Sequence, residues 1–344
     1  MQQNIFGKTL NELYSIADEF RAPKYLAKQL AIWLYKKNIS SFDAMTDLAV
    51  NYKKKLRENY SIIKYPYLEK LESVDGTKKY LFSTSGENEF IETVLIPENK
   101  RQTLCISTQV GCALGCEFCQ TGKQGFSRNL NTDEIINQIY SIDEFEKITN
   151  IVYMGMGEPL LNTENVLKSI DILTAEWGLK ISGKKITVST VGIIPNLKDF
   201  IVNTPCNIAI SLHSPFHEER KRIMPIENKY SIKSVIESIK KLNKEVKKKI
   251  SIEYIVFKNL NHSKKHVNAL AKLLNPISCK INLMSNHEIP DIELKSFESK
   301  IIEQFAEQLK QKGFNVTIRK SRGKDIKAAC GLLTTAKIVM ENRK

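Results

Sequence analysis

Hydrophobic residues recur with a helical period in the first 60 residues of the chain. Leu26, Leu30, Trp33 and Leu34 are spaced to fall on one face of a helix, and Arg-Ala-Pro at 21–23 is a typical start signal. The pattern predicts a small helical unit over residues 1–60.

Between residues 62 and 97 the pattern changes to short strand-like runs. Runs at 80–83 and 91–96 are accompanied by turn signals at 75–76 (Asp-Gly) and 85–86 (Ser-Gly). We therefore predict a small β unit over residues 61–97 that links the helical unit to the rest of the chain.

From residue 101 onward, strand-like runs alternate with amphipathic helical runs, as is typical of βα units around a parallel sheet. The strand-like runs lie at residues 103–108, 150–154, 185–190, 207–212, 249–256, 280–284 and 316–319. Apolar helix faces between them are formed by Val166, Ile170 and Leu173 and by Ile232, Ile236, Ile239 and Leu242. We predict an α/β fold with a partial (β/α)6 barrel over residues 98–344.

Polar segments follow several of these predicted strands. In parallel α/β folds, the residues that perform chemistry come directly after the carboxyl ends of the strands. This rule selects the segments 109–119, 155–158, 189–190, 211–213 and 286–287. We expect these segments to meet on one rim of the barrel.

The composition is that of a globular protein. Of its 344 residues, 42% are hydrophobic and 8% aromatic, which excludes a disordered chain and a small disulfide-stapled scaffold. The longest apolar run, residues 30–35, is far shorter than the roughly 20 residues that a membrane span needs. We expect a soluble cytoplasmic protein that has no membrane partner.

The charge balance favours a polyanionic partner. Lys and Arg number 52 against 38 Asp and Glu, which gives a net charge of +14. A solvated lysine-rich surface explains the same composition, so charge alone leaves nucleic-acid binding as one of two interpretations.

Seven cysteines are present, at positions 105, 112, 116, 119, 206, 279 and 330. Their odd number and uneven spacing argue against a disulfide framework. Cys112, Cys116 and Cys119 form a Cys-x3-Cys-x2-Cys array shortly after a predicted strand. A structural zinc site usually has four ligands in two pairs, whereas three thiolates suit a 4Fe–4S cluster with one iron open to a further ligand.

This array, at the end of the first strand of a partial barrel, resembles the radical S-adenosylmethionine (SAM) superfamily. The resemblance implies a 4Fe–4S cluster held by Cys112, Cys116 and Cys119. It also implies that SAM binds the open iron and is cleaved to a 5′-deoxyadenosyl radical. The residues implied to contact SAM are Gly157, Glu158, Ser189, Ser211, Leu212, His213 and Asn286.

Each of these residue types also has an ordinary structural interpretation. A Gly-x-Gly segment is commonly a turn, serine is common at strand ends, and a single histidine is commonly structural. The superfamily's asparagine falls on His287 without a gap and on Asn286 after a one-residue deletion, and we assign it to Asn286.

Longer segments resemble the RlmN family of radical SAM RNA methyltransferases. They are residues 154–162, 189–192 and 325–331, and the resemblance spans nearly the full chain. It implies methylation of C2 of an adenine in 23S ribosomal RNA, at the peptidyl-transferase centre, and of the adenine 3′ of the anticodon in transfer RNA. Two SAM molecules are implied for each turnover.

The same resemblance implies roles for three further residues. Cys330 is first methylated and then, as a thiomethylene radical, adds to C2 of adenine. Cys105 releases the product through a transient disulfide bond with Cys330, and Glu92 accepts a proton. An electron donor such as flavodoxin or ferredoxin is also implied, and we expect a monomer. On its residue type alone, Cys330 is more commonly a structural cysteine. Strand alternation puts Glu92 on one face with Val94 and Ile96, where an apolar surface would raise its pKa and suit a base, and a solvated edge carboxylate is the equal alternative.

Other residues receive simpler interpretations. We expect Cys206 and Cys279 to be packing residues. Basic residues of the predicted helical unit are candidates for contacts with RNA phosphates, namely Lys24, Lys28, Lys36, Lys37, Lys53, Lys54, Lys55 and Arg57.

Three alternative functions stay open at this point. A Cfr-like enzyme methylates C8 of adenine, but Pro159 argues against it because that group usually has Ala there. Leu332 differs from the RlmN pattern, because members of that family usually have Gln at this position. The remaining hypotheses are a radical enzyme acting on a peptide or small metabolite and a zinc-dependent RNA-binding protein.

Overall fold

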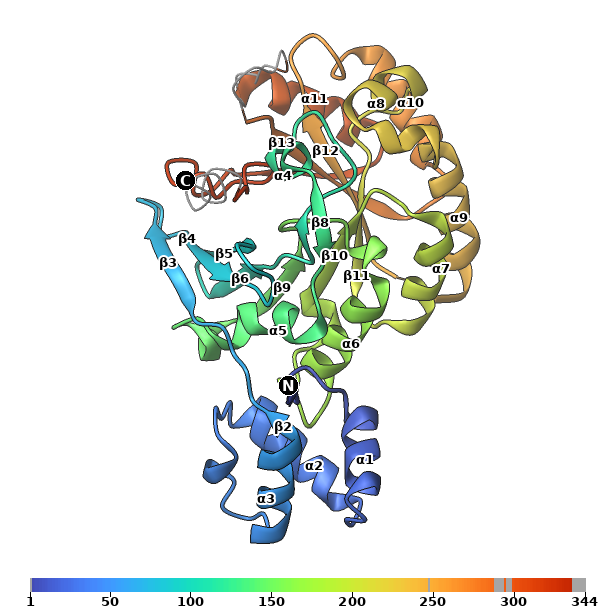
Figure 1. Ribbon diagram of the computed structural model, residues 1–344. Coiled ribbons are helices and arrows are strands. Elements are labelled where there is room, and N and C mark those ends of the chain that lie inside the picture. Colours follow the sequence, from blue (N-terminus) through green and yellow to red (C-terminus); the bar gives the residue numbers. More distant parts are fainter. Residues whose placement is uncertain (1, 247, 288–293, 295–298, 336–344) are drawn as a thin grey trace.

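The N-terminal unit is built from α1 (Leu10–Glu19), α2 (Tyr25–Ala31) and α3 (Val50–Asn59), which lie below the larger part of the molecule in Figure 1. The computed structural model describes residues 2–246, 248–287, 294 and 299–335. Short strands β1 (Gln3–Asn4) and β2 (Tyr60–Ser61) pair in parallel beside these helices. The residues predicted to form an apolar face are buried, namely Leu26, Leu30, Trp33 and Leu34. The prediction of a helical unit is therefore confirmed.

Aromatic residues dock this unit against α5 (Thr132–Tyr140). The ring of Phe6 lies 5.9 Å from that of Tyr35 and 5.5 Å from that of Tyr140, measured between centroids. Gly7 has a φ of +95°, and a Cβ at this position would lie 2.6 Å from the backbone nitrogen of Asp133. Glycine thus permits a close approach between the two parts of the chain.

A single sheet of ten strands runs through the larger part, in the order β14-β13-β12-β11-β10-β9-β6-β5-β4-β3. Its strands are β3 (Tyr67–Glu72), β4 (Lys78–Ser83), β5 (Phe90–Glu98), β6 (Arg101–Cys105), β9 (Asn150–Tyr153), β10 (Ile186–Thr190), β11 (Asn207–Ser211), β12 (Ile250–Val256), β13 (Cys279–Ser285) and β14 (Asn315–Arg319). The strands from β6 and β9 to β14 pair in parallel with their neighbours. Since β14 ends the sheet, the barrel is open, as predicted.

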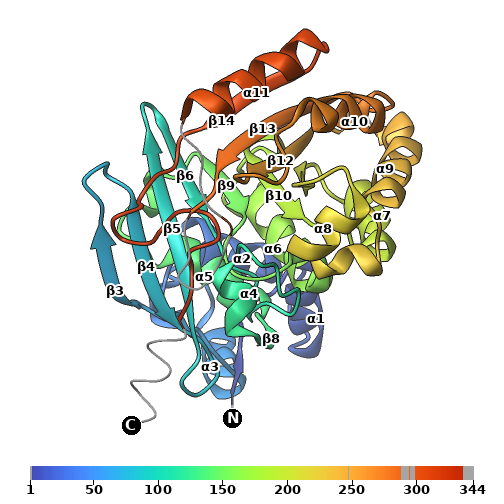
Figure 2. The same cartoon turned by 90° about the horizontal axis from the view of Figure 1, so that it is seen from above.

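The strands predicted as a separate β unit belong to this same sheet. β3, β4 and β5 pair antiparallel with one another, and β5 continues antiparallel onto β6. Figure 2 shows them on the side of the barrel opposite α9. The strands themselves are confirmed, although no break in the sheet marks residue 97. The division of the chain at residues 60 and 97 stays a prediction.

Helices cover the outer face of the parallel strands (Figure 2). They are α6 (Thr163–Thr174), α7 (Ile194–Asn203), α8 (His217–Ile223), α9 (Ile232–Val246), α10 (Lys264–Leu274) and α11 (Ser299–Gln311). The apolar faces predicted at residues 166–173 and 232–239 are buried. In the part of the chain that the structure describes, no helix is long and apolar enough to cross a membrane.

Candidate active site

The loop with the three clustered cysteines lies between β7 (Gln109–Gly111) and β8 (Phe126–Asn129), ahead of the short helix α4 (Gln120–Gln124). Backbone hydrogen bonds shape it: the Cys112 N–H donates to the Gly125 carbonyl at 2.8 Å, and the Cys119 N–H donates to the Cys116 carbonyl at 3.1 Å. Cys112 and Cys116 are buried and Cys119 is half-buried. The loop thus holds all three thiols on the inner side of the rim.

All three thiols line one cavity of about 160 Å³. Burial raises the pKa of each thiol, that of Cys112 to about 12, so bound metal must supply the positive charge that keeps them as thiolates. Among the described residues, no three His, Cys, Asp or Glu side chains are grouped as ligands of one metal ion. Since a cluster binds each thiolate through a different iron, these thiols fit a 4Fe–4S cluster better than a zinc ion.

Most of the residues predicted to contact SAM border the same cavity. Gly157, Glu158, Ser189, Ser211 and His213 line it together with the three cysteines. They come from the ends of β9, β10 and β11, which confirms that polar segments after different strands meet on one rim. Leu212 is fully buried and does not line the cavity, so its predicted contact with SAM stays a prediction.

Glu158 is fixed by backbone donors. The Leu160 N–H donates to Oε1 and the Val191 N–H donates to Oε2, both at 3.0 Å. Burial raises the pKa of Glu158 to about 7. The carboxylate therefore ties two rim loops together and keeps a lone pair for a cationic ligand.

His213 has a defined tautomer. Its Nδ1 accepts a hydrogen bond from the Ile255 N–H at 3.0 Å, so Nε2 carries the proton. Burial lowers the pKa of His213 to about 3, which keeps the ring neutral. The ring meets Phe118 edge-on, with centroids 4.8 Å apart. His213 is thus a neutral donor at the cavity wall.

Arg220 on α8 is a site residue that the sequence analysis missed. Its side chain is fully buried, and it donates to the carbonyls of Ser211 and Leu212, each at 3.0 Å, and of Val191 at 3.2 Å. It also pairs with the buried carboxylate of Glu227. Arg220 therefore holds the backbone of the rim in place through hydrogen bonds to its carbonyl groups.

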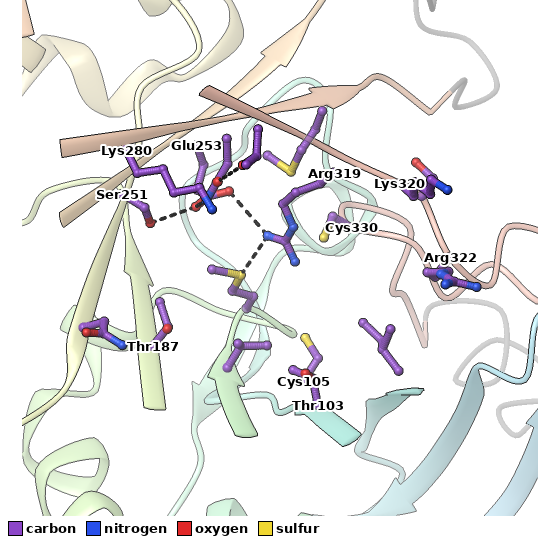
Figure 3. A pocket seen from close by; sticks show the side chains of 18 of the residues that line it. Thr103, Cys105, Thr187, Ser251, Glu253, Lys280, Arg319, Lys320, Arg322 and Cys330 are labelled. Atoms are coloured by element: carbon purple, nitrogen blue, oxygen red, sulfur yellow. Dashed lines mark hydrogen bonds and ion pairs between the residues drawn. The ribbon is translucent and has the colours of Figure 1, made fainter. Parts of the chain in front are cut away.

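A second, larger cavity of about 1250 Å³ lies inside the barrel (Figure 3). Both Cys105 and Cys330 line it, and both are free thiols. Burial raises the pKa of Cys105 to about 12, and a negative charge on Cys330 adds to this effect. Cys330 is exposed and also borders the smaller cavity.

Asn286 and His287 line the larger cavity and not the smaller one. The Asn286 amide donates to the Leu294 carbonyl at 2.6 Å, and His287 Nε2 lies 3.0 Å from the Ser321 hydroxyl. The structure thus separates Asn286 from the five other predicted SAM contacts that face the smaller cavity. Its contact with SAM stays a prediction.

The segment that carries Cys330 is held on both sides. The Gln120 N–H donates to the Gly331 carbonyl at 2.7 Å, which ties the segment to the cysteine loop. On the other side, Asp325 accepts from the Ser73 hydroxyl at 2.6 Å, and the Gly323 N–H donates to Asp75 at 3.0 Å. The turn between β3 and β4 therefore anchors the segment that precedes Cys330.

Glu92 lies on β5 and lines neither cavity. Its carboxylate is buried, pairs with Lys79 at 2.7 Å and accepts from the Thr334 N–H at 2.8 Å. Burial raises the pKa of Glu92, although Lys79 opposes this effect. The solvated edge interpretation is wrong, because the side chain is 5% exposed.

The remaining two cysteines differ from each other. Cys206 is buried in the hydrophobic core, which confirms it as a packing residue. Cys279 packs against the core but is half-buried and lines the larger cavity at the start of β13. The interpretation as a packing residue is thus incomplete for Cys279.

Comparisons with known proteins agree with this architecture. Residues 106–272 match the radical SAM superfamily, and residues 3–62 match the ribosomal RNA large subunit methyltransferase N-terminal domain. The crystal structure of a radical SAM methyltransferase from Sphaerobacter thermophilus is similar with a TM-score of 0.89 and 33% identity, covering 96% of this chain and 99% of that chain. Fold and site thus define a radical SAM methyltransferase, a class that uses a 4Fe–4S cluster and SAM.

Relatives narrow the class further. The chain is 47% identical to a probable dual-specificity RNA methyltransferase RlmN of Bacteroides thetaiotaomicron, over 98% of each chain. It is 41% identical to the dual-specificity RNA methyltransferase RlmN of Desulfotalea psychrophila, over 94% of this chain and 93% of that one. The chain belongs to the RlmN family, as its motifs indicated.

Proposed function

We propose that this chain methylates C2 of adenine in 23S ribosomal RNA and in transfer RNA, using two SAM molecules per turnover and Cys330 as the methyl carrier. The observation that carries the proposal is the position of Cys330, which borders both the cavity with the three clustered thiols and the larger cavity in the barrel. A carrier has to reach the methyl donor on one side and the RNA base on the other.

The chemistry of the base explains why a carrier is needed. C2 of adenine lies between two ring nitrogens and is electron-poor, so it does not attack the methyl group of a sulfonium ion. When bound, the cluster and SAM supply the methyl group and the radical chemistry that activates it. Gly157, Glu158, Ser189 and the segment 211–213 hold SAM in the smaller cavity, and Asn286 contacts its adenine.

Cys105 completes the cycle in this proposal. After the carbon on Cys330 has bonded to C2, the C2 hydrogen leaves as a proton to Glu92, and the unpaired electron of the adduct would return to the bound cluster, which would have supplied one electron for the cleavage of SAM. The Cys105 thiolate then attacks the Cys330 sulfur. A sulfur–sulfur bond forms, the sulfur–carbon bond breaks with its electron pair going to the new methyl carbon, and that carbon takes a proton. A dithiol reductant then returns the disulfide to two thiols, while flavodoxin or ferredoxin supplies electrons to the cluster.

Recognition of RNA begins at the helical unit in this proposal. Basic residues of this unit contact phosphates without reading sequence, namely Lys53, Lys54, Lys55 and Arg57 of α3, Lys28 of α2, and Lys24, Lys36 and Lys37 in the segments next to α2. The target adenine is unpaired or turned out of its helix so that it enters the barrel. The enzyme acts as a monomer in the cytoplasm.

Mass spectrometry of RNA tests the proposal. We expect 2-methyladenosine in 23S ribosomal RNA and transfer RNA to disappear when the gene is deleted and to return with the wild-type gene but not with Cys330→Ala. A matched control, Cys206→Ala, changes a buried cysteine outside both cavities and should restore the modification. Loss of 8-methyladenosine instead, or no change in either base, would refute the proposal.

A further inference from the structure

Arg319 lines the same cavity inside the barrel as the two thiols of the proposed reaction. Arg319 is the last residue of β14, and its side chain borders both cavities. Figure 3 shows it pointing into the space between Cys330 and Cys105. Burial favours the neutral form of Arg319, but Cys330, Glu253 and Cys105 outweigh it and raise its pKa, so the group stays charged.

A buried polar network orients this guanidinium group. Arg319 Nη1 lies 3.4 Å from Glu253 Oε2. The other carboxylate oxygen, Oε1, accepts from the Ser251 hydroxyl at 3.0 Å and from the Asn282 amide at 2.8 Å, and the Asn282 oxygen accepts from Thr317 at 2.6 Å. The Glu253 side chain is 4% exposed. Side chains from β12, β13 and β14 thus fix the carboxylate that positions the arginine.

Arg319 keeps hydrogen-bond donors for a ligand. Its described side-chain contacts, with Glu253 and with the Met154 sulfur at 3.7 Å, both involve Nη1. A guanidinium group has five N–H donors, and a thioether sulfur is a weak acceptor. The side chain is 34% exposed, and it borders the larger cavity.

The proposed reaction places adenine next to this group. C2 has to lie beside the Cys330 sulfur, because the carbon on that sulfur bonds to it. It has to lie near Cys105 as well, because Cys105 attacks the same sulfur. Since N1 and N3 are the two atoms bonded to C2, both of them lie in the part of the cavity that Arg319 lines together with the two thiols.

We propose that Arg319 is a catalytic residue that donates a hydrogen bond to N1 or N3 of the target adenine, and that Glu253 positions it. This inference rests on the proposed function. A hydrogen bond to a ring nitrogen withdraws electron density from C2 and so favours addition of the electron-rich thiomethylene radical.

The addition step itself balances without a proton transfer. One carbon–carbon bond forms from the unpaired electron on the thiomethylene carbon and one electron of a ring π bond. The second electron of that π bond stays in the ring, where it spreads over atoms that include the nitrogens. Arg319 donates throughout and loses no proton, which agrees with the high pKa of a guanidinium group.

Deaza analogues of the substrate test this inference. Purified, cluster-loaded enzyme with premethylated Cys330 is given one of three RNA hairpins, whose target base is adenosine, 1-deazaadenosine or 3-deazaadenosine, and the rate of C2 product formation is measured. We expect Arg319→Gln to be about 100-fold slower than wild type on adenosine, as when a transition-state donor is removed. The ratio of the wild-type rate to the Arg319→Gln rate should fall to near one on the analogue that lacks the nitrogen bonded by Arg319. On the analogue that keeps this nitrogen, the ratio should stay near 100.

Controls separate this role from a structural one. Arg319→Gln should keep its iron, its RNA-independent cleavage of SAM and its ability to acquire a methyl group on Cys330. Lys312→Gln removes one positive charge at an exposed position directly after α11 and should match wild type on all three RNAs. Glu253→Gln should be slowed on adenosine, and its ratio to wild type should shrink on the same analogue as for Arg319→Gln.

Two results would overturn the inference. The first is an Arg319→Gln enzyme with wild-type rate on adenosine. The second is a ratio of wild type to Arg319→Gln that is the same on all three RNAs, which would assign Arg319 to the fold of the cavity. If wild-type enzyme itself forms no 2-methyladenosine, the proposed function fails and the inference fails with it.

Discussion

The fully buried Arg220 offers a sharp test of how the rim is held in place. Its guanidinium group satisfies the carbonyls of Val191, Ser211 and Leu212 and pairs with Glu227, whose side chain is 2% exposed. Arg220→Met keeps much of the side-chain length but removes the charge and all of these donors. It leaves one buried carboxylate without its arginine and three backbone acceptors without this donor.

The expected loss of stability follows from these contacts. Removing one partner of a buried ion pair costs about 3–5 kcal/mol, and each buried acceptor left unpaired adds about 1–3 kcal/mol unless water reaches it. Because such terms do not add fully, we expect Arg220→Met to lower the free energy of unfolding by about 5 kcal/mol. In the double variant Arg220→Met with Glu227→Gln, no buried charge is left alone, and we expect a loss of about 2 kcal/mol.

Urea unfolding followed by circular dichroism measures these differences through the shift of the midpoint. Lys221→Met, at an exposed position of the same helix, is the matched control and should change stability by no more than about 0.5 kcal/mol. SAM affinity should fall in Arg220→Met even where the protein is folded, because the rim backbone loses its support. A loss below about 1 kcal/mol, or a double variant worse than Arg220→Met alone, would refute this reasoning.

Three further predictions concern the cofactor and the carrier. Cys116→Ala should lose iron and SAM cleavage, since one cluster ligand is gone, and normal iron content with normal methylation would contradict the ligand assignment. Cys105→Ala should stall with RNA bonded to Cys330 through a methylene group, visible as a shifted band on a denaturing gel; normal turnover would disprove its role. Burial raises the pKa of Glu158 to about 7, so its negative charge is lost as the pH falls through 7. SAM, whose ammonium group favours the ionised form, should therefore bind about fivefold more weakly at pH 6 than at pH 7. A wild-type affinity that does not change between pH 6 and pH 8, or an equal pH dependence in Glu158→Gln, would argue against the contact.

Local patterns predicted the strands and the cysteine loop well. All seven predicted strand-like runs in the barrel overlap observed strands, because buried parallel strands form short apolar runs that end at polar segments. The three clustered thiols share one short loop, so their spacing alone brought them together. The expectation that polar residues after the carboxyl ends of parallel strands meet on one rim then identified residues 157–158, 189, 211 and 213, which line one cavity.

Interactions between distant parts of the chain could not be predicted in the same way. Glu92 accepts a hydrogen bond from a residue 242 positions away, and Asp325 from one 252 positions away. Contacts between residues so far apart produce no periodic pattern in the sequence, so they could not be predicted from it. Arg220 and Arg319 have an ordinary local sequence setting, and only the folded chain shows that Arg220 supports the rim backbone and that Arg319 lines the cavities.

The segment around Cys330 is tied at both ends, which bears on how a methyl carrier can combine movement with accurate placement. In the proposed reaction the thiol has to meet the methyl donor, the adenine and Cys105 in turn, which requires movement, yet each encounter requires accurate placement. Asp325 fixes one end of the segment to the turn between β3 and β4, and the Gly331 carbonyl fixes the other end to α4. Both ties lie outside the thiol itself, which is exposed and borders both cavities. We therefore expect changes within residues 326–330 to redirect the sulfur while the two tied ends of the segment stay in place.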